Sequence, residues 1–409
     1  MKSDVLIIGA ELDGLLAALR LQDLGYSVRL LAFGVGSFHY APGGVRVLSQ
    51  VSGVDPNPAV DPFDLLPYLC GKHPYSLLGT SRIKSALRWF FDRFHSAMEI
   101  QQPSGRNHQI PSLVGQPLTF YAPLSGQVTF QILQGKTVIL VSFEGHQDFA
   151  GRLIGQELSA SGVGVIELDL PGPERQTGTV AIARAFDRVE DLQVFFQTLL
   201  ELAVVKGAEI VLFPAVLGMK KHRQILRFFS KRGLTCGEIP TLPPSIPGLR
   251  INDNLQSELI GGGTLIHQGA KADGIETHGN RVQAVFDGQG QRLECSALLL
   301  CSGGVLMGGL EVDSHHRVSE PFLGLEAIAA EGLASGYIDG VLDGLHRSGV
   351  EVDAQLRPKQ KGRGTIENLF VTGSTIAHWN PVQESSAEGV SIATAWAASE
   401  AVSRLLEAR

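Results

Sequence analysis

The chain has 409 residues, more than one ordinary hydrophobic core supports, so we expect two domains or one enlarged α/β domain. Its apolar content of 44% allows extensive burial, and 48 glycines favour an α/β enzyme with many tight turns. The formal net charge is -7, and basic residues do not form a long run interleaved with aromatics, which argues against nucleic acid as a partner.

Four scattered cysteines without a CxxC pair argue against an iron–sulfur cluster or a zinc ribbon, so we predict no metal site. The sequence has neither a secretory signal pattern nor an uninterrupted apolar span of about 20 residues. We therefore expect a cytoplasmic chain with no transmembrane segment of its own and with reduced thiols.

Residues 5–34 predict a strand, a glycine turn, a helix and a second strand. An apolar run suits a parallel strand buried on both faces, and leucines at helical spacing follow it. The turn contains Gly9, Ala10, Glu11 and Gly14, so the outer glycines of a GxGxxG fingerprint are present. We expect a Rossmann-like βαβ unit whose turn binds a dinucleotide, or the same unit without a ligand.

Two positions of this unit depart from the fingerprint. Glu11 stands where a glycine would let backbone N–H groups approach a pyrophosphate, and it adds a side chain and a negative charge. The acid that would hold a ribose hydroxyl is missing, because Ala32 stands near its expected place. Both departures weaken the prediction of a bound dinucleotide.

The loop 34–53 follows the second predicted strand and is rich in glycine and small polar residues. Gly43 and Gly44 would allow close backbone contact with a flat ligand, and His39 could donate a hydrogen bond or exchange a proton. A plain surface loop is the alternative. A proline-rich connection follows over residues 54–71. After it we expect a helix with a large apolar face, for which Ser81 is a possible N-cap.

Strands and helices alternate regularly from residue 135. Apolar strands are predicted at 136–143, 163–170 and 208–216, with helical segments between them, which indicates a small parallel sheet with right-handed crossovers. Residues 143–146 lack a glycine-rich phosphate loop, so we interpret this part as a scaffold or substrate-side domain. We interpret the basic segment 220–232 as a solvated helix face, and a phosphate or lipid site is the alternative.

The final third returns to the first domain. A proline-built linker from residue 240 leads into a helix that Asn252 or Asp253 would cap, and a three-stranded meander ends in an apolar strand before Gly303. A later strand leads to a turn at Gly373 and Ser374, and a long helix starts near Gly389. We expect a discontinuous flavin- or dinucleotide-binding domain over 1–70 and 240–409, and an inserted α/β domain over 71–239.

Several sequence blocks carry a family resemblance. They lie in the family's order across nearly the whole chain: HPYSLL at 73–78, IARAFD at 182–187, PTLPPSIPGLR at 240–250, EPFLGL at 320–325, LRP at 356–358 and TIENLF at 365–370. On these blocks the chain resembles the B subunit of anaerobic glycerol-3-phosphate dehydrogenase, which has a flavoprotein fold.

This resemblance implies oxidation of glycerol 3-phosphate to dihydroxyacetone phosphate, with electrons passing to a quinone pool. It implies FMN or FAD as cofactor, the catalytic flavin-containing A subunit of that enzyme and its membrane-associated iron–sulfur C subunit as partners, and a peripheral place at the inner face of the cell membrane. Flavin chemistry of this kind needs a base and cationic phosphate contacts. The candidates are His39 as base, Arg250 and Arg46 as phosphate or flavin anchors, and Gly43 and Gly44 at the flavin ring.

The chain also departs from the family at expected cofactor contacts. Glu11 replaces a glycine, and the family's glycine-rich run before the last helix becomes residues 384–388, which include Glu384 and Glu388. Carboxylates at a helix N-terminus would satisfy the helix dipole themselves and repel a phosphate. A non-catalytic assembly protein that has lost its cofactor is therefore the alternative, and a dehydrogenase of another 2-hydroxy acid or polyol phosphate is a further one.

Overall fold

A computed structural model describes residues 2–34, 36–55, 57, 59–334, 337–360 and 365–408. The chain forms two compact units. Unit 1 contains Met1–Ser37, Arg46–Arg93 and Asn252–Arg409, and unit 2 contains Phe38–Val45 and Phe94–Ile251. Residues 71–93, which we expected in the inserted domain, thus belong to unit 1, and residues 240–251 belong to unit 2.

Unit 1 is built on a mixed sheet with the strand order β10-β11-β12-β1-β2-β9, and β17 pairs with β12 beside this path. The strands are β1 Lys2–Ile8, β2 Val28–Ala32, β9 Leu265–Gln268, β10 Ala272–His278, β11 Arg281–Asp287, β12 Arg292–Leu300 and β17 Leu369–Val371. β1 pairs in parallel with β2 and β12, whereas β11 pairs antiparallel with β10 and β12. The predicted parallel sheet with a β-meander is confirmed.

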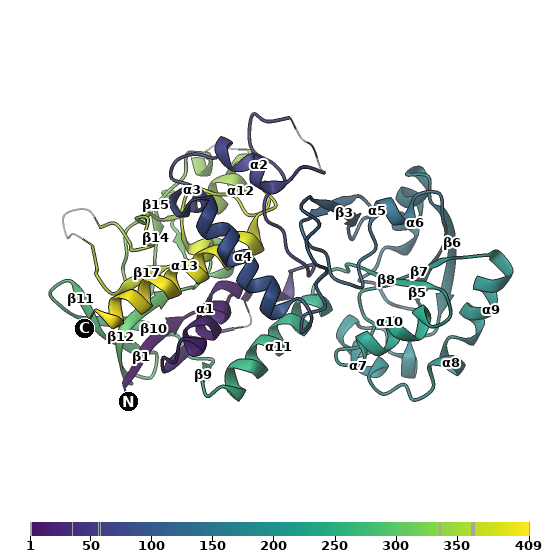
Figure 1. The fold of residues 1–409 in the computed structure, drawn as a ribbon, viewed down its shortest axis with the longest axis horizontal. Coiled ribbons are helices and arrows are strands. Elements are labelled where there is room, and N and C mark those ends of the chain that lie inside the picture. Colours follow the sequence, from purple (N-terminus) through teal and green to yellow (C-terminus); the bar gives the residue numbers. More distant parts are fainter. Residues whose placement is uncertain are drawn as a thin grey trace. The chain divides into compact units, whose positions relative to one another are not determined.

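The helices of unit 1 include two that pack along each other, α1 and α13, near β1 and β12 (Figure 1). The helices are α1 Leu12–Asp23, α2 Pro62–Leu65, α3 Pro74–Leu78, α4 Thr80–Phe94, α12 Ile338–Arg347 and α13 Ala387–Glu407. Short strands complete the unit: β13 Glu311–Val312, β14 Val318–Ser319, β15 Ala327–Ile328 and β16 Gly349–Val350. Val5, Leu6 and Ile7 of β1 are fully buried, as expected for a parallel strand covered on both faces.

Unit 2 contains a four-stranded parallel sheet in the order β6-β5-β7-β8. Its elements are β3 His108–Pro111, β4 Pro117–Phe120, α5 Phe130–Leu133, β5 Thr137–Phe143, α6 Gly151–Ala160, β6 Gly164–Leu170, α7 Thr179–Phe186, α8 Leu192–Phe195, α9 Gln197–Lys206, β7 Ile210–Pro214, α10 His222–Ser230 and β8 Thr235–Ile239. Alternate residues of β5 enter two cores, since Ile139 packs with a phenylalanine-rich cluster and Leu140 packs with Ile154 of α6. The predicted smaller α/β fold is confirmed.

Two details differ from the sequence expectation. Strand β8 was not predicted, because it contains Gly237 and the charged Glu238 in place of an apolar run. The helix after the proline linker, α11, runs over Ile246–Gly261, so neither Asn252 nor Asp253 caps it. The hydroxyl of Ser245 accepts a hydrogen bond from the Gly248 N–H at 3.1 Å instead, which is the usual role of a capping serine.

Candidate functional site

The turn after β1 has the close packing that a Rossmann turn requires. Gly9 has φ +107°, and a Cβ atom there would overlap the carbonyl of Cys301. A Cβ atom on Gly14 would overlap the carbonyl of Gly9, and Ala10 is buried. Both glycines therefore let the turn, α1 and the end of β12 approach each other, with or without a ligand.

Glu11 turns its carboxylate toward the loop after β2. Oε1 and Oε2 accept hydrogen bonds from the Ser37 N–H at 3.0 and 3.1 Å, and Oε2 accepts one from the Ser37 hydroxyl at 2.5 Å. A Cβ atom placed on Gly36 would lie 2.5 Å from Oε1, and one placed on Gly303 would lie 3.5 Å from it. The carboxylate thus fills the space between the loops that follow β2 and β12.

Burial raises the pKa of Glu11 above its ordinary value, although the hydrogen bonds from Ser37 lower it in part. The residue is only 7% exposed. A carboxylic acid so buried is either a neutral group or a costly negative charge. In both forms it takes up room that a nucleotide would need.

A second acid, Asp13, lies one residue into α1 and was missed by sequence reasoning. Its carboxylate accepts a hydrogen bond from the Thr372 hydroxyl, and the residue is 3% exposed. Burial, together with the nearby Glu11, raises the pKa of Asp13 to about 7, although the hydrogen bond from Thr372 lowers it in part. A Cβ atom on Gly373, which has φ +57°, would lie 2.6 Å from Cγ of Asp13, so the predicted turn of Gly373 and Ser374 packs directly on this acid.

These contacts test whether the turn fits the pyrophosphate of a dinucleotide. In this fold the pyrophosphate lies at the N-terminus of the first helix, and an acid after the second strand holds the ribose. Here β2 ends at the buried Ala32, and Ser37 beyond it bonds to Glu11. The residues do not fit a pyrophosphate while Glu11 holds this position.

The N-terminus of α13 is covered by the chain itself. Glu388 forms a bidentate ion pair with Arg46, whose Nε and Nη2 donate at 2.8 and 2.6 Å, and it also accepts from the Arg46 N–H. The N–H of Gly389 donates to the carbonyl of Arg46 at 2.8 Å. A Cβ atom on Gly389 would lie 2.8 Å from Cα of Val47. Glycine is therefore needed here for the segment that contains Val47 to pack against α13.

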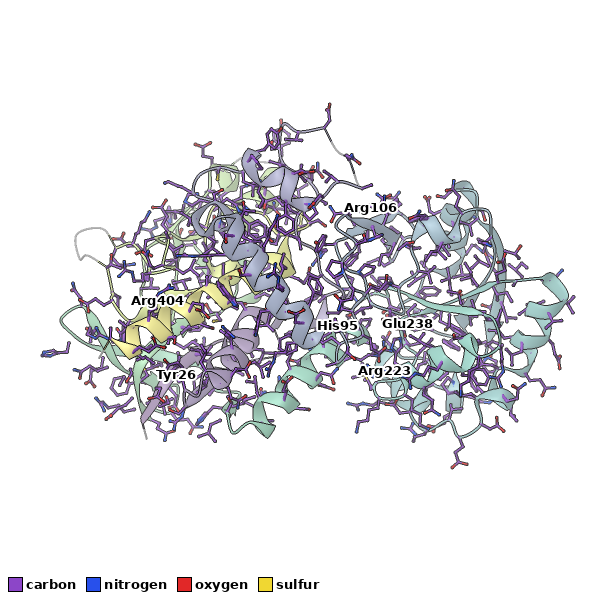
Figure 2. All side chains as sticks on the ribbon, in the orientation of Figure 1. Tyr26, His95, Arg106, Arg223, Glu238 and Arg404 are labelled. Carbon is purple, nitrogen blue, oxygen red and sulfur yellow. The ribbon has the colours of Figure 1, made fainter. Side chains whose placement is uncertain are left out.

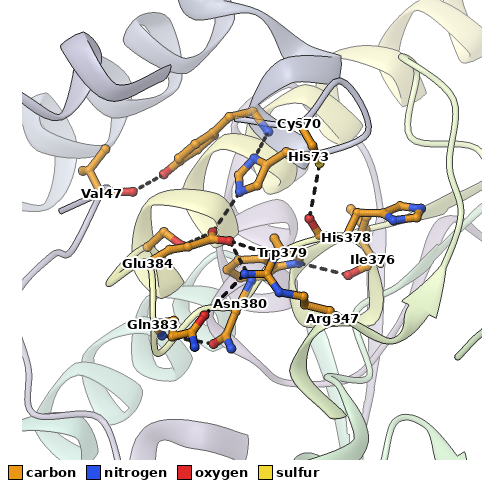
Figure 3. Close-up of polar contacts among 12 residues, drawn as sticks. Val47, Cys70, His73, Arg347, Ile376, His378, Trp379, Asn380, Gln383 and Glu384 are labelled. Atoms are coloured by element: carbon orange, nitrogen blue, oxygen red, sulfur yellow. Dashed lines mark hydrogen bonds and ion pairs between the residues drawn. The ribbon is translucent and has the colours of Figure 1, made fainter. Parts of the chain in front are cut away.

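Glu384 has a similar structural setting, drawn in Figure 3. Nδ1 of His73 accepts the N–H of Tyr75 at 3.0 Å and caps α3, so the opposite nitrogen, Nε2, donates to Glu384 at 3.0 Å. Glu384 also accepts the N–H of Asn380 at 3.0 Å and lies 3.4 Å from Nη1 of Arg347. Glu384, the first residue of the segment that replaces the family's glycine-rich run, therefore ties the loop before α13 to α3.

The other predicted residues lie in unit 2. The His39 carbonyl accepts the Ser245 N–H at 2.8 Å, and the half-buried imidazole has no hydrogen-bond partner among the described residues. Gly43 and Gly44 have φ +81° and +74°, and Cβ atoms there would crowd Leu124 and Phe120, respectively. His39, Arg250, Gly43 and Gly44 thus share unit 2, whereas Arg46 and the remaining predicted positions lie in unit 1; their roles stay predictions.

Arg250 belongs to a buried charge cluster that sequence reasoning also missed. Its guanidinium pairs with Glu238 at 2.7 and 3.0 Å and donates to the carbonyl of Gly218 at 2.8 Å. His222 lies 2.8 Å from Glu99 and 3.0 Å from Glu238, which is labelled in Figure 2. Burial alone would raise the pKa of Glu238, but Arg250 and His222 hold it far below its usual range.

The pKa of His222 is raised in the same cluster. Burial and Arg250 lower it, but Glu238 and Glu99 raise it by more. The only sequence signal for this cluster was the basic segment that contains His222, and that segment gave no hint of its acidic partners.

No helix among the described residues has the length and apolarity to cross a bilayer.

Comparison with known proteins identifies the fold. The family model described as "FAD binding domain" matches residues 4–390. The B subunit of anaerobic glycerol-3-phosphate dehydrogenase from Vibrio cholerae is 28% identical, over 98% of this chain and 97% of the relative. The protein from Halobacterium salinarum named as the probable B subunit of that enzyme is 29% identical, over 99% of both chains.

Among solved structures, 3-ketosteroid Δ1-dehydrogenase from Sterolibacterium denitrificans matches with a TM-score of 0.46 and 12% identity, over 98% of this chain and 99% of that one. A likeness at that score carries no argument about activity. The family match supports a flavin, FAD or FMN, as the cofactor of this fold. The chain therefore belongs to the FAD binding domain family, and its relatives confirm the resemblance to the B subunit of anaerobic glycerol-3-phosphate dehydrogenase.

Proposed function

We propose that the chain is the B subunit of an anaerobic glycerol-3-phosphate dehydrogenase. The complex oxidises sn-glycerol 3-phosphate to dihydroxyacetone phosphate and passes the electrons to a quinone. One observation carries this proposal: relatives named as the B subunit, or as the probable B subunit, match nearly the full length of both chains.

The proposed partners are the flavin-containing A subunit of the enzyme and its iron–sulfur C subunit. The chain would lie in the cytoplasm, at the inner face of the membrane, through its contact with them. The relatives are named as B subunits, which also implies a complex. Electron transfer beyond this chain would use those partners.

His39 is the proposed base for the substrate hydroxyl, because its imidazole has no hydrogen-bond partner among the described residues. Arg46 and Arg250 are the proposed phosphate contacts. Each already holds a carboxylate in bidentate fashion, Glu388 and Glu238 respectively. A substrate phosphate would therefore share the guanidinium with that carboxylate, which makes both arginines weaker phosphate ligands than unpaired ones.

The test is the rate of acceptor reduction by the purified complex of all three proteins with glycerol 3-phosphate, 2-hydroxy acids and other polyol phosphates. We expect glycerol 3-phosphate to be turned over with the highest kcat/KM. His39→Gln should lower kcat and leave complex formation intact. Preferred turnover of another substrate would contradict the proposal.

A second candidate function is a non-catalytic assembly protein that keeps the flavoprotein fold without a cofactor. The inward pairing of Glu11 with Ser37 and of Glu388 with Arg46 favours it. The absorption spectrum of the purified chain, with chromatography of any flavin released on denaturation, separates the two. Stoichiometric flavin would support the first candidate, and absence of flavin in a complex that still needs this chain would support the second.

A further inference from the structure

An open pocket lies within unit 2, beside the basic segment 220–232. Its volume is about 450 Å³, and its walls are one side of α10, the segment 95–100 that follows α4, and Ser125. Figure 2 labels two of its lining residues, His95 and Arg223. The basic segment therefore borders a hollow, which a plainly solvated helix face would not require.

The helix α10 uses one face for the core of unit 2 and another for the pocket. Ile225 and Phe229 are fully buried in the phenylalanine-rich cluster. Four side chains at the spacing of a single helical stripe line the pocket instead: Arg223, Leu226, Arg227 and Ser230. The core thus fixes the orientation in which α10 presents its arginines.

Arg223 is held in place at the wall of the pocket. Its Nη2 donates to the carbonyl of Ser96 at 2.6 Å, and its Nε donates to Glu99 at 3.2 Å. The side chain is still 45% exposed, so these bonds position the guanidinium without burying it. A donor that is fixed beforehand loses little freedom when it binds a ligand.

Arg227 stands one helical turn further along the same stripe. Its side chain is exposed and has no hydrogen-bond or ion-pair partner among the described residues. Like charges four residues apart on a helix repel each other, which costs stability. An anion between Arg223 and Arg227 would remove that repulsion.

The charge of the lining favours an anion. Glu99 is the one carboxylate among the described lining residues, and it is already engaged by Arg223 and by His222, whose Nδ1 lies 2.8 Å from it. Two guanidinium groups face this single acid. Hydroxyl groups add neutral donors to the lining, from Ser96, Ser125 and Ser230.

We propose that this pocket binds a phosphate monoester, with its phosphate between Arg223 and Arg227 and its carbon part against Leu226 and Ile100, which also line the pocket. Guanidinium groups match the oxygens of a phosphate, and a dianion balances two of them, whereas a carboxylate would balance one. The site uses none of the residues proposed for the dehydrogenase, so it can be tested separately.

Two sources share this chemistry, a soluble phosphate ester and the headgroup of phosphatidic acid. Phenyl phosphate, with benzoate as the singly charged control, is titrated into the full-length chain by calorimetry. The chain is also sedimented with phosphatidylcholine vesicles that contain or lack phosphatidic acid. We expect phenyl phosphate to bind at least about tenfold more tightly than benzoate. Sedimentation that requires phosphatidic acid would identify the lipid, and phenyl phosphate binding without it would identify a soluble ester.

Variants assign the binding to this pocket. Arg227→Gln should weaken binding of phenyl phosphate about tenfold, and Arg227→Lys, which keeps the charge without the planar fork, should weaken it less. Lys231→Gln is the matched control, because Lys231 belongs to the same basic segment but does not line the pocket, and it should leave binding unchanged. Both side chains are exposed, so neither change threatens folding.

Two results would overturn the proposal. One is the absence of binding tighter than about 1 mM for phenyl phosphate together with the absence of sedimentation by phosphatidic acid. The other is equal weakening by Arg227→Gln and Lys231→Gln, which would show a general attraction to the basic surface in place of a site.

Discussion

Two carboxylates, those of Glu11 and Asp13, are buried at the start of α1, where the free N–H groups of a helix ordinarily face an anion. Glu11 reaches the loop after β2, and Asp13 reaches the turn after β17. Each acid thus makes a contact within the protein at a place where this fold family contacts its cofactor. The two side chains decide whether unit 1 can accept a dinucleotide.

Glu11→Gly should strengthen binding of FAD. The change removes the carboxylate from the space beside Gly36 and Gly303 and restores the glycine that lets backbone N–H groups approach a pyrophosphate. We expect FAD affinity, followed by quenching of flavin fluorescence, to rise at least about tenfold. Glu11→Gln is the control, because it keeps the side chain's volume and should leave affinity near that of the parent. Equal affinity of the Gly variant and the parent would contradict this account.

Asp13 should make unit 1 less stable as pH rises. Its pKa is raised from 3.8 to about 7 by burial, so between these values the folded protein holds a proton that the unfolded chain releases. The free energy of unfolding therefore falls as pH rises from about 4 to about 7 and then levels off. Asp13→Asn should remove this part of the slope and stabilise unit 1 at pH 8 by about 4 kcal/mol at most.

Urea unfolding of the parent and Asp13→Asn at pH 5 and pH 8 measures this effect. The difference between the two proteins should be larger at pH 8. A difference that does not change with pH would show that Asp13 titrates near its ordinary value when folded.

At the scale of elements, the N-terminus of α13 is closed by the segment that contains Arg46. The ion pair with Glu388 is mostly buried, with side-chain exposures of 16% and 11%. Removing one member of such a pair leaves a buried charge without its partner. The helix end is therefore sensitive to either single change.

Arg46→Gln and Glu388→Gln should each lower the free energy of unfolding of unit 1 by about 3 kcal/mol. The double variant should lose less than the sum, with a coupling energy of roughly 1–3 kcal/mol. Urea unfolding of the four proteins gives the coupling. Additive losses would mean that the two side chains do not depend on each other for stability.

The elements that the sequence predicts have regular apolar patterns, whereas the missed ones depend on partners that are distant in sequence or lie among prolines. The strands β1, β5 and β7 are apolar runs, and α1 and α4 have regular apolar faces, so pattern alone predicts them. Strand β8 was missed because Glu238 is buried there only through its pairing with Arg250 and His222, which are distant in sequence. The start of α11 was misplaced because Ser245 is surrounded by prolines, which favour a linker interpretation.

The same limit applies to the candidate site. Sequence reasoning identified Glu11 and Glu388 as departures from the family, but it could not tell that Ser37 and Arg46 would hold them. Asp13 had no motif around it. Its importance comes from its burial and from its contacts with Thr372 and Gly373, and neither can be derived from spacing along the chain.

At the scale of the whole molecule, the two units have separate hydrophobic cores, and we expect separate unfolding transitions. All three tryptophans, including Trp89 and Trp379, lie in unit 1, so tryptophan fluorescence follows that unit alone. Circular dichroism follows the helices of both units. Comparing the two signals therefore separates their stabilities.

Arg250→Met should destabilise unit 2 by about 3 kcal/mol, because it removes the bidentate partner of the buried Glu238. The circular dichroism transition of unit 2 should shift to lower urea concentration, and the tryptophan fluorescence transition should stay in place. Arg227→Met, which changes an exposed arginine of α10, is the control and should shift neither by much. An equal shift of both signals would contradict the separation of the units.

The proposed place of the chain in a glycerol-3-phosphate dehydrogenase is the central claim. It is tested most directly by the rate of quinone reduction with glycerol 3-phosphate, measured on the flavin-containing and iron–sulfur partners purified together, with and without this chain. We predict that the rate depends on stoichiometric addition of the chain. Full quinone reduction by the two partners alone, unchanged when this chain is added, would contradict the account.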